Sequence, residues 1–332
     1  MSTPLASWLL GAALALAVPV TLQVPARAES AASQLNVDRT ALARQQREEA
    51  RFHALAWQLV TGNAAFCANS APAIGLVLQD VQGFAAPGRI RAAAGIAGDI
   101  FVQVVIPGSP ADKAGLRVGD EILAIGSRPV SDFPSDSQER WRRQVALQDA
   151  LDANLATTGT AVVRWRRAGG VAKESRFLGE PACPSRFELR TEGDDAMAEG
   201  SRVVFGREFA GFAYPDDELA AALAHELAHN LLRHREWLAT QGRKQSAIRK
   251  TEREADRLMP WLLANAGFEP EAAIRFMVRW GKKHDAGLLR KRTHDGWDER
   301  VEAIEAEVVL VKARLAAGGV ADWSSNFRRG LE

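Results

Sequence analysis

Residues 216–236, DDELAAALAHELAHNLLRHRE, decide the fold of the second half of the chain. Ala, Leu and Glu dominate this stretch, and because they are the strongest helix formers it predicts an α-helix from an N-cap at Asp216 to Glu236. At about 100° per residue, leucines spaced four residues apart form one stripe of this helix. His225 and His229 lie on the opposite side.

The spacing of these two histidines predicts a metal site. Four residues separate His225 from His229, so both imidazoles can bind one ion, while Glu226 can contact water on that ion without ligating it. The alternative is a charged helix face with two incidental histidines. Since the pattern is that of hydrolytic zinc sites, we expect the metal.

A second helix offers the remaining ligand. Residues 246–266, SAIRKTEREADRLMPWLLANA, predict a helix that follows a turn near residues 240–242. Glu252 can complete the site as the third ligand. Asp256, one turn further on, can accept the free N–H of a metal-bound histidine and fix its tautomer.

The chain contains HELAH followed by EREAD. In this it resembles the gluzincin zinc metallopeptidases of the HtpX and CAAX-prenyl-endoprotease type, whose signature is HExxH followed by ExxxD. The resemblance implies one Zn²⁺ per chain, held by His225, His229 and Glu252. It makes Glu226 the general base and places Asp256 behind the ligands. Leu232 and Arg235 occupy the positions where metzincins need Gly and a third His, whereas thermolysin-type enzymes remain an alternative.

A later family element matches THDGWDER, residues 293–300. The resemblance implies that His294 donates a hydrogen bond to the oxyanion of the reaction. Arg300 either donates as well or holds Asp256 in place. The family usually has Pro where this chain has Asp295, which departs from the pattern of the loop.

A strand-rich segment precedes this region. Strands are expected at residues 74–78, 100–106 and 121–125, a helix at 138–156, and two further strands around Gly169-Gly170. With GSPADKAGLRVGDEILAI at residues 108–125, the segment resembles a bacterial protease-associated PDZ domain. The resemblance implies that Ile74-Gly75-Leu76 captures the terminal carboxylate of a peptide that adds as a strand. The alternative is an ordinary strand entry.

The chain contains two cysteines, Cys67 and Cys183, one on each side of the PDZ-like segment. In an exported protein two cysteines more often pair than stay free, so a disulfide is expected. The alternative is two buried thiols in a cytosolic protein.

The first residues predict export. Residues 5–24 are almost wholly apolar, and Ala26-Arg27-Ala28 has the form of a signal-peptide cleavage site. We expect a periplasmic protein with no membrane span after cleavage. No Lys or Arg precedes the apolar run, so an uncleaved membrane anchor is the alternative.

These observations predict an α+β protein with four parts: a signal peptide at 1–28, a helical segment at 29–66, a PDZ β-sandwich or partial barrel at 67–183, and a helix-dominated zincin (gluzincin) domain with a small edge sheet at 184–332. The expected function is zinc-dependent endoproteolysis of polypeptides that the PDZ domain selects by their C-termini, as in envelope protein quality control. The alternative is a non-catalytic binding or chaperone module with a structural zinc hairpin. A net charge of +1 argues against a nucleic-acid partner.

Overall fold

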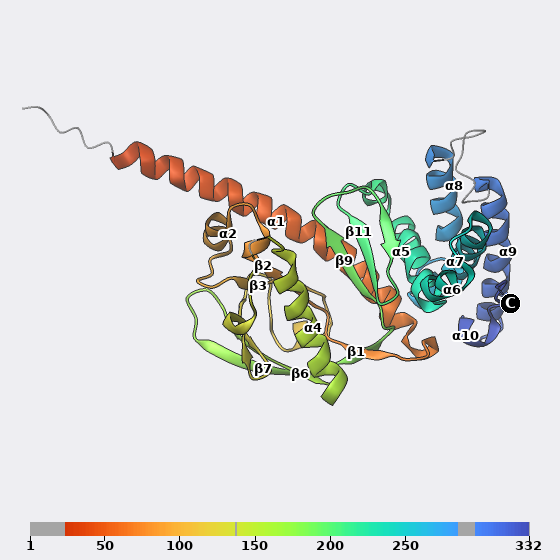
Figure 1. Ribbon diagram of the computed structural model, residues 1–332, viewed down its shortest axis with the longest axis horizontal. Coiled ribbons are helices and arrows are strands. Elements are labelled where there is room, and N and C mark those ends of the chain that lie inside the picture. Colours follow the sequence, from red (N-terminus) through yellow and green to blue (C-terminus); the bar gives the residue numbers. More distant parts are fainter. Residues whose placement is uncertain (1–23, 137, 285–295, 332) are drawn as a thin grey trace, which may run out of the picture.

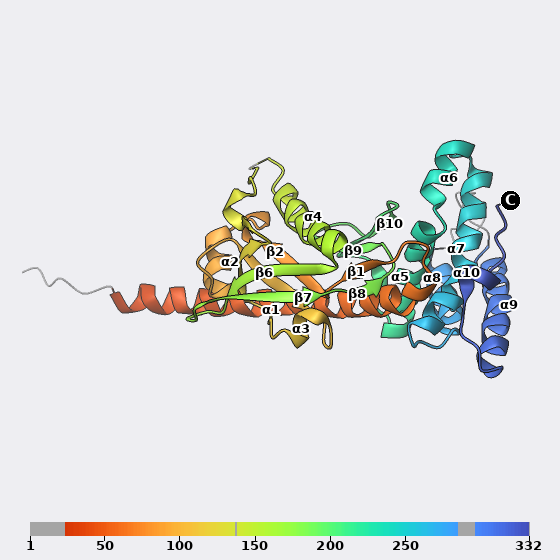
Figure 2. The ribbon, with the colours of Figure 1, turned by 90° about the horizontal axis from the view of Figure 1, so that it is seen from below.

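The fold is known from a computed structural model that describes residues 24–136, 138–284 and 296–331. A long helix, α1 (Val24–Gly62), runs beside a strand-rich unit and ends within a helical unit (Figures 1 and 2). The helix lies close to the helical segment expected at 29–66, but begins at Val24 and ends at Gly62. The expected cleavage site, Ala26-Arg27-Ala28, falls within α1.

The middle and the C-terminal end of α1 pack against different units. Leu42 is buried against Val81 and Phe101 of the strand-rich unit. Further along the helix, Phe52 and Leu59 are fully buried in the core of the helical unit. One continuous helix therefore braces both units.

The strand-rich unit is one antiparallel sheet with the order β2-β3-β4-β6-β7, in which β5 also pairs with β4. Its core of Ile, Leu, Val and Phe side chains lies between this sheet and α4. The expected strands and helix are all present, with ends shifted by a few residues. Their bounds are β2 (Leu76–Asp80), β3 (Ile100–Val105), β4 (Glu121–Ile125), β5 (Arg128–Pro129), β6 (Thr160–Arg166), β7 (Ala172–Leu178), α2 (Pro87–Ala94), α3 (Pro110–Lys113) and α4 (Trp141–Thr158).

The chain enters and leaves this unit side by side. The short strands β1 (Ala71–Ala73) and β8 (Glu180–Ala182) pair antiparallel. Next to them a disulfide joins Cys67 to Cys183 as the sequence predicted, with 5.5 Å between their Cα atoms. The unit is thus closed at its base by backbone pairing and by a covalent bond.

A three-stranded sheet follows, formed by β9 (Arg186–Arg190), β10 (Ala196–Ala198) and β11 (Arg202–Gly206) in the order β10-β11-β9. β11, the strand before the HELAH helix, pairs on both sides and is the central strand. The edges of this sheet are β9 and β10.

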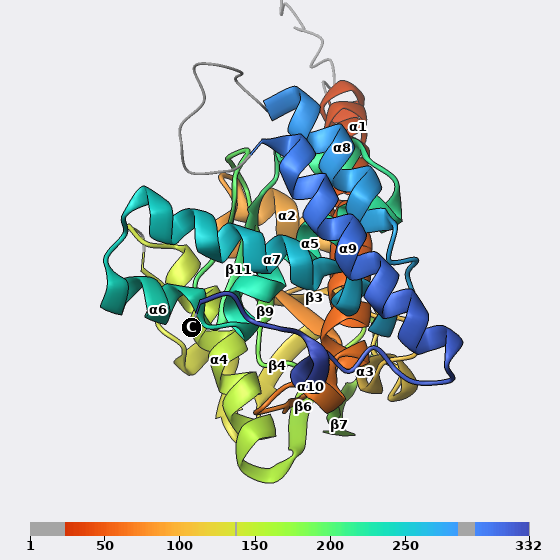
Figure 3. The ribbon, with the colours of Figure 1, turned by 90° about the vertical axis from the view of Figure 1, so that its right-hand side faces the viewer.

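The helical unit contains the HELAH helix at its centre (Figure 3). That helix, α5, ends at Leu231 instead of Glu236, because Arg233 adopts a left-handed backbone conformation with φ 57° and starts a new helix at His234. Pro215, not Asp216, is its N-cap. The helices are α5 (Asp216–Leu231), α6 (His234–Gln241), α7 (Gln245–Asn265), α8 (Ala272–His284), α9 (Trp297–Ala316) and α10 (Trp323–Asn326).

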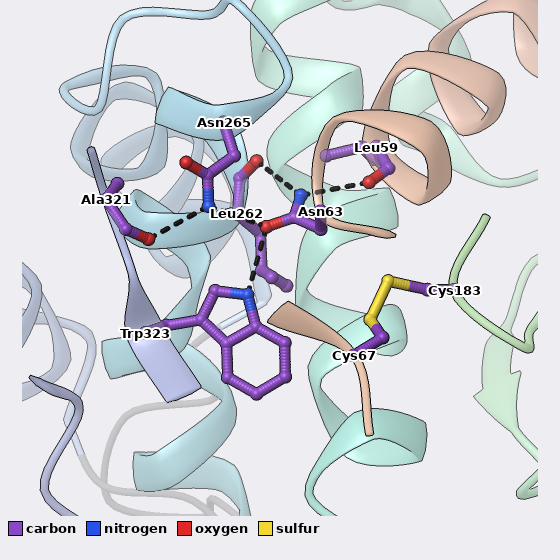
Figure 4. Close-up of a disulfide and its surroundings, with 8 residues drawn as sticks. All are labelled: Leu59, Asn63, Cys67, Cys183, Leu262, Asn265, Ala321 and Trp323. Carbon is purple, nitrogen blue, oxygen red and sulfur yellow. Dashed lines mark hydrogen bonds between the residues drawn. A yellow bond between two sulfur atoms is a disulfide. The ribbon is translucent and has the colours of Figure 1, made fainter. Parts of the chain in front are cut away.

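The buried side chain of Asn63 ties three distant segments together (Figure 4). Its Nδ2 donates to the carbonyls of Leu59, at 2.9 Å, and Leu262, at 3.0 Å. Its Oδ1 accepts from Asn265 Nδ2, at 2.9 Å, and Trp323 Nε1, at 3.1 Å. All four bonding positions of the amide are used, which links the ends of α1 and α7 to the C-terminal segment.

Candidate functional site

Helices α5 and α7 pack against each other and present the expected ligands to one point. His225 and His229 lie on adjacent turns of α5, and Glu252 faces them from α7. His225 Nε2 lies 3.2 Å from His229 Nε2 and 3.3 Å from Glu252 Oε2, and His229 Nε2 lies 3.5 Å from Glu252 Oε1. The structure therefore brings together the three residues that the sequence singled out.

These separations fit a tetrahedral metal ion. Zinc bonds of about 2.0–2.1 Å at tetrahedral angles keep neighbouring donor atoms about 3.3–3.4 Å apart. The 3.2 Å between the two imidazole nitrogens matches that edge length, and a Glu252 oxygen lies within 3.5 Å of each nitrogen, Oε2 near His225 and Oε1 near His229. Two imidazole nitrogens with one carboxylate form a common zinc donor set. The residues present could hold one zinc ion and leave its fourth position for water.

Asp256 lies behind His225, as the sequence predicted for it. Its Oδ1 is 3.1 Å from His225 Nδ1, the ring nitrogen that points away from the cluster. Arg300 donates to both oxygens of Asp256, from Nε at 2.6 Å and from Nη2 at 2.7 Å. Two roles were expected for Arg300, and this contact corresponds to the second, in which Arg300 holds Asp256 in place.

The charges in the cluster favour a cation. Burial opposes protonation of His225, but hydrogen bonds to Asp256 and Glu252 outweigh it and raise the pKa of His225 to about 10. Burial lowers the pKa of His229 to about 3. Arg300 already pairs with Asp256, so without a metal ion a proton on His225 would compensate the charge of Glu252, and a bound cation would take the place of that proton.

Glu226 is adjacent to the cluster without belonging to it, since the converging donor atoms come from His225, His229 and Glu252. Burial raises the pKa of Glu226 to about 7, with a further contribution from Glu252 and from Asp195 just before β10. A carboxyl group with such a pKa can accept a proton and return it near neutral pH.

Two groups next to the ligands were not predicted. His234 contacts His229, and Glu254 contacts His234, each through a buried side chain. On one continuous helix His234 would point about 140° away from His229, so the break at Arg233 was needed to bring them together. The sequence signal was present, a third histidine after HELAH, but only the backbone gives it a role. His294 lies outside the described residues.

The expected peptide site of the strand-rich unit lies where β2 begins. Gly75 has φ 68°, and a Cβ there would meet the Cβ of Ser109 at 2.4 Å, so the turn requires glycine. The carbonyls of Ile74 and Gly75 accept from the backbone N–H groups of Ala111 and Ile106, which fixes the loop. Whether the loop binds a carboxylate remains a prediction.

The free edge of β2 faces α4, and one side chain of α4 covers it. Gln144 Nε2 donates to the Leu78 carbonyl at 2.9 Å, and its Oε1 accepts from the Asp80 N–H at 3.1 Å. These are backbone groups with which an added peptide strand would pair. Beyond this edge a cavity of about 1310 Å³ extends to β9 and α1.

The comparisons with known proteins bear on the strand-rich unit. The PDZ domain family matches residues 101–139, so this unit contains a PDZ domain. A stretch of 56 residues is 41% identical to the "Putative serine protease HhoA" of Synechocystis sp., which covers 17% of this chain and 14% of that protein. The family match ends at residue 139, before His225, His229 and Glu252, so the assignment of these three residues depends on their own geometry.

Among the described residues, no helix combines the length and the apolar character needed to cross a membrane.

Proposed function

We propose that the chain is a zinc-dependent metalloendopeptidase of the gluzincin type, which selects polypeptides through its PDZ domain. The observation that supports this most strongly is the convergence of donor atoms from His225, His229 and Glu252, with Glu226 next to them. A structural zinc site would normally fill all four positions with protein ligands, whereas three converge among the residues that are described. The fourth position is then available to water.

In this proposal the chain's own residues move one proton. When bound, zinc would polarise the scissile carbonyl and lower the pKa of water towards about 7. Glu226 accepts a proton from a water molecule while the oxygen of that water bonds to the carbonyl carbon. Glu226 then returns that proton to the amide nitrogen as the C–N bond breaks. Asp256, held by Arg300, keeps the ring of His225 in orientation.

The PDZ domain would supply substrate selection. PDZ domains add a peptide as a strand to the sheet edge, so polypeptides with a free, apolar C-terminus are the expected ligands at Ile74-Gly75-Leu76. We place the protein in the periplasm, after removal of residues 1–28 as a signal peptide, since Ala26-Arg27-Ala28 has the form of a cleavage site. Misfolded envelope proteins are the substrate class that this location favours.

The test compares labelled-casein cleavage by the wild type, Glu226→Gln and the control Glu305→Gln, an exposed glutamate on α9. Glu226→Gln should lower turnover by at least about 100-fold while retaining about one zinc per chain, because it removes the base and no ligand. The control should cleave at the wild-type rate. Cleavage by Glu226→Gln at the wild-type rate would refute the assignment of the base.

A second measurement addresses the class of protease, because the relative is named a serine protease. A zinc chelator should stop cleavage and added zinc should restore it, whereas a fluorophosphonate that labels active serines should have no effect. The opposite pair of results would contradict the zinc mechanism.

A further inference from the structure

The second histidine of HELAH has a chain of polar contacts behind it that differs from the one behind the first. His225 contacts a carboxylate directly, through Asp256. His229 Nδ1 instead lies 2.9 Å from Nδ1 of another histidine, His234, whose Nε2 lies 3.0 Å from Glu254 Oε2. Both His234 and Glu254 are almost fully buried, at 1% and 2% exposed.

The backbone builds this contact at a cost. Arg233 is the one non-glycine residue with positive φ in the parts of the chain that the structure describes. For such a residue the left-handed conformation is unfavourable, because Cβ lies too close to the following carbonyl oxygen. The turn it makes starts α6 at His234 and folds that ring back onto the last turn of α5.

The C-terminal segment holds the far end of the chain of contacts. After α10 the segment returns towards α6, where the C-terminal end is labelled in Figure 3. There Arg329 Nη2 donates to Glu254 Oε2 at 3.0 Å, and the Gly330 N–H donates to Glu254 Oε1 at 2.5 Å. Both oxygens of Glu254 therefore accept hydrogen bonds.

If His229 binds a metal through Nε2, only one assignment of the hydrogens on the ring nitrogens of His229 and His234 is possible. Its Nδ1 must then carry the hydrogen and donate it, so His234 Nδ1 is the acceptor. A neutral His234 that accepts at Nδ1 carries its hydrogen on Nε2, which donates to Glu254. Every contact from His229 to Arg329 thus has one donor and one acceptor.

We propose that His234 and Glu254, fixed by Arg329 and Gly330, position His229 for metal binding, so that the C-terminal segment completes the metal site. The inference rests on the proposed zinc site but not on peptide cleavage. His234 and Glu254 are positioning residues, because they act through His229 and do not contact the metal or substrate.

The first test measures zinc affinity by competition with a chelator, for the wild type, His234→Ala and His234→Gln. His234→Ala should bind zinc about 10- to 100-fold more weakly, the usual effect of losing a partner behind a ligand. His234→Gln retains one acceptor and one donor, so it should recover most of the affinity. Equal affinity of the wild type and His234→Ala would overturn the inference.

The C-terminal contact is tested in the same assay. Arg329→Ala should weaken zinc binding several-fold, and removal of residues 329–332 by at least as much. Arg328→Ala, a change at the adjacent exposed arginine, is the matched control and should bind as the wild type does. Wild-type affinity in the truncated protein would refute a role for the segment.

A measurement on the wild type avoids the risk that a variant fails to fold. Long-range ¹⁵N–¹H correlation in the zinc-loaded protein should show His229 protonated at Nδ1 and His234 at Nε2. His234 protonated at Nδ1 would overturn the inference. A wild type that binds no zinc would instead refute the proposed function itself, so the two failures are distinguishable.

Discussion

Replacing Asn63 with leucine should destabilise the protein by about 2–4 kcal/mol, although the two side chains have similar shapes. The carbonyls of Leu59 and Leu262 would still accept backbone N–H groups, and Asn265 Nδ2 would still donate to Ala321. Trp323 Nε1 would lose its acceptor inside the protein. An unsatisfied buried donor costs about 1–3 kcal/mol, and the remaining lost bonds add about 1 kcal/mol between them.

The assay is urea denaturation of the metal-free, disulfide-bonded protein, followed by far-UV circular dichroism. Removing the metal keeps zinc affinity from contributing to the measured stability. Asn36→Leu, at an exposed position of α1, is the control and should change stability by less than about 0.5 kcal/mol. A change of that small size for Asn63→Leu would refute the account of Asn63 as the link between α1, α7 and the C-terminal segment.

Two further predictions concern the peptide groove and the response to acid. Gln144→Ala should raise the affinity of the PDZ domain for peptides with a free C-terminus by about 5- to 10-fold, because it uncovers the backbone of Leu78 and Asp80. A fluorescence titration measures this affinity, and weaker binding would contradict the covering role of Gln144. Burial lowers the pKa of His53 from 6.5 to about 4. The contribution of neutral His53 to the free energy of unfolding is therefore fully present above pH 6.5, and it falls by up to about 1.4 kcal/mol per pH unit as the pH drops towards 4. His53→Gln should flatten that fall in urea titrations, and an unchanged slope would show that His53 is not responsible.

The convergence of His225, His229 and Glu252 could be predicted because it follows largely from local spacing. His225 and His229 share a helix face in any α-helix, and EREAD indicates a carboxylate on a later helix, which is α7. The residues behind His229 could not be predicted, because their contact depends on a left-handed residue at Arg233. Arginine has no particular preference for that conformation, so the sequence contains no signal for the break.

The strand-rich unit was predictable for a related reason. Its Gly-Asp and Pro-Gly turns and β-branched runs indicate β3, β4 and β6 locally, and the expected elements differ from the observed ones mainly at their ends. The order β10-β11-β9 was not predictable, because the pairing of three short strands depends on contacts distant in sequence. The same holds for Gln144, whose role appears only when α4 lies against β2.

The Asn63 link also has a consequence for the order of events during synthesis. A ribosome makes Asn63 260 residues before Trp323, its partner in the C-terminal segment. A nascent chain can therefore form HELAH and EREAD as helices while the ends of α1 and α7 still lack their partners from residues 321–323. With Arg329 and Gly330 also missing from Glu254, such a chain would bind zinc weakly. In the proposed enzyme, the zinc site would therefore be completed only after residues 321–330 have joined the fold.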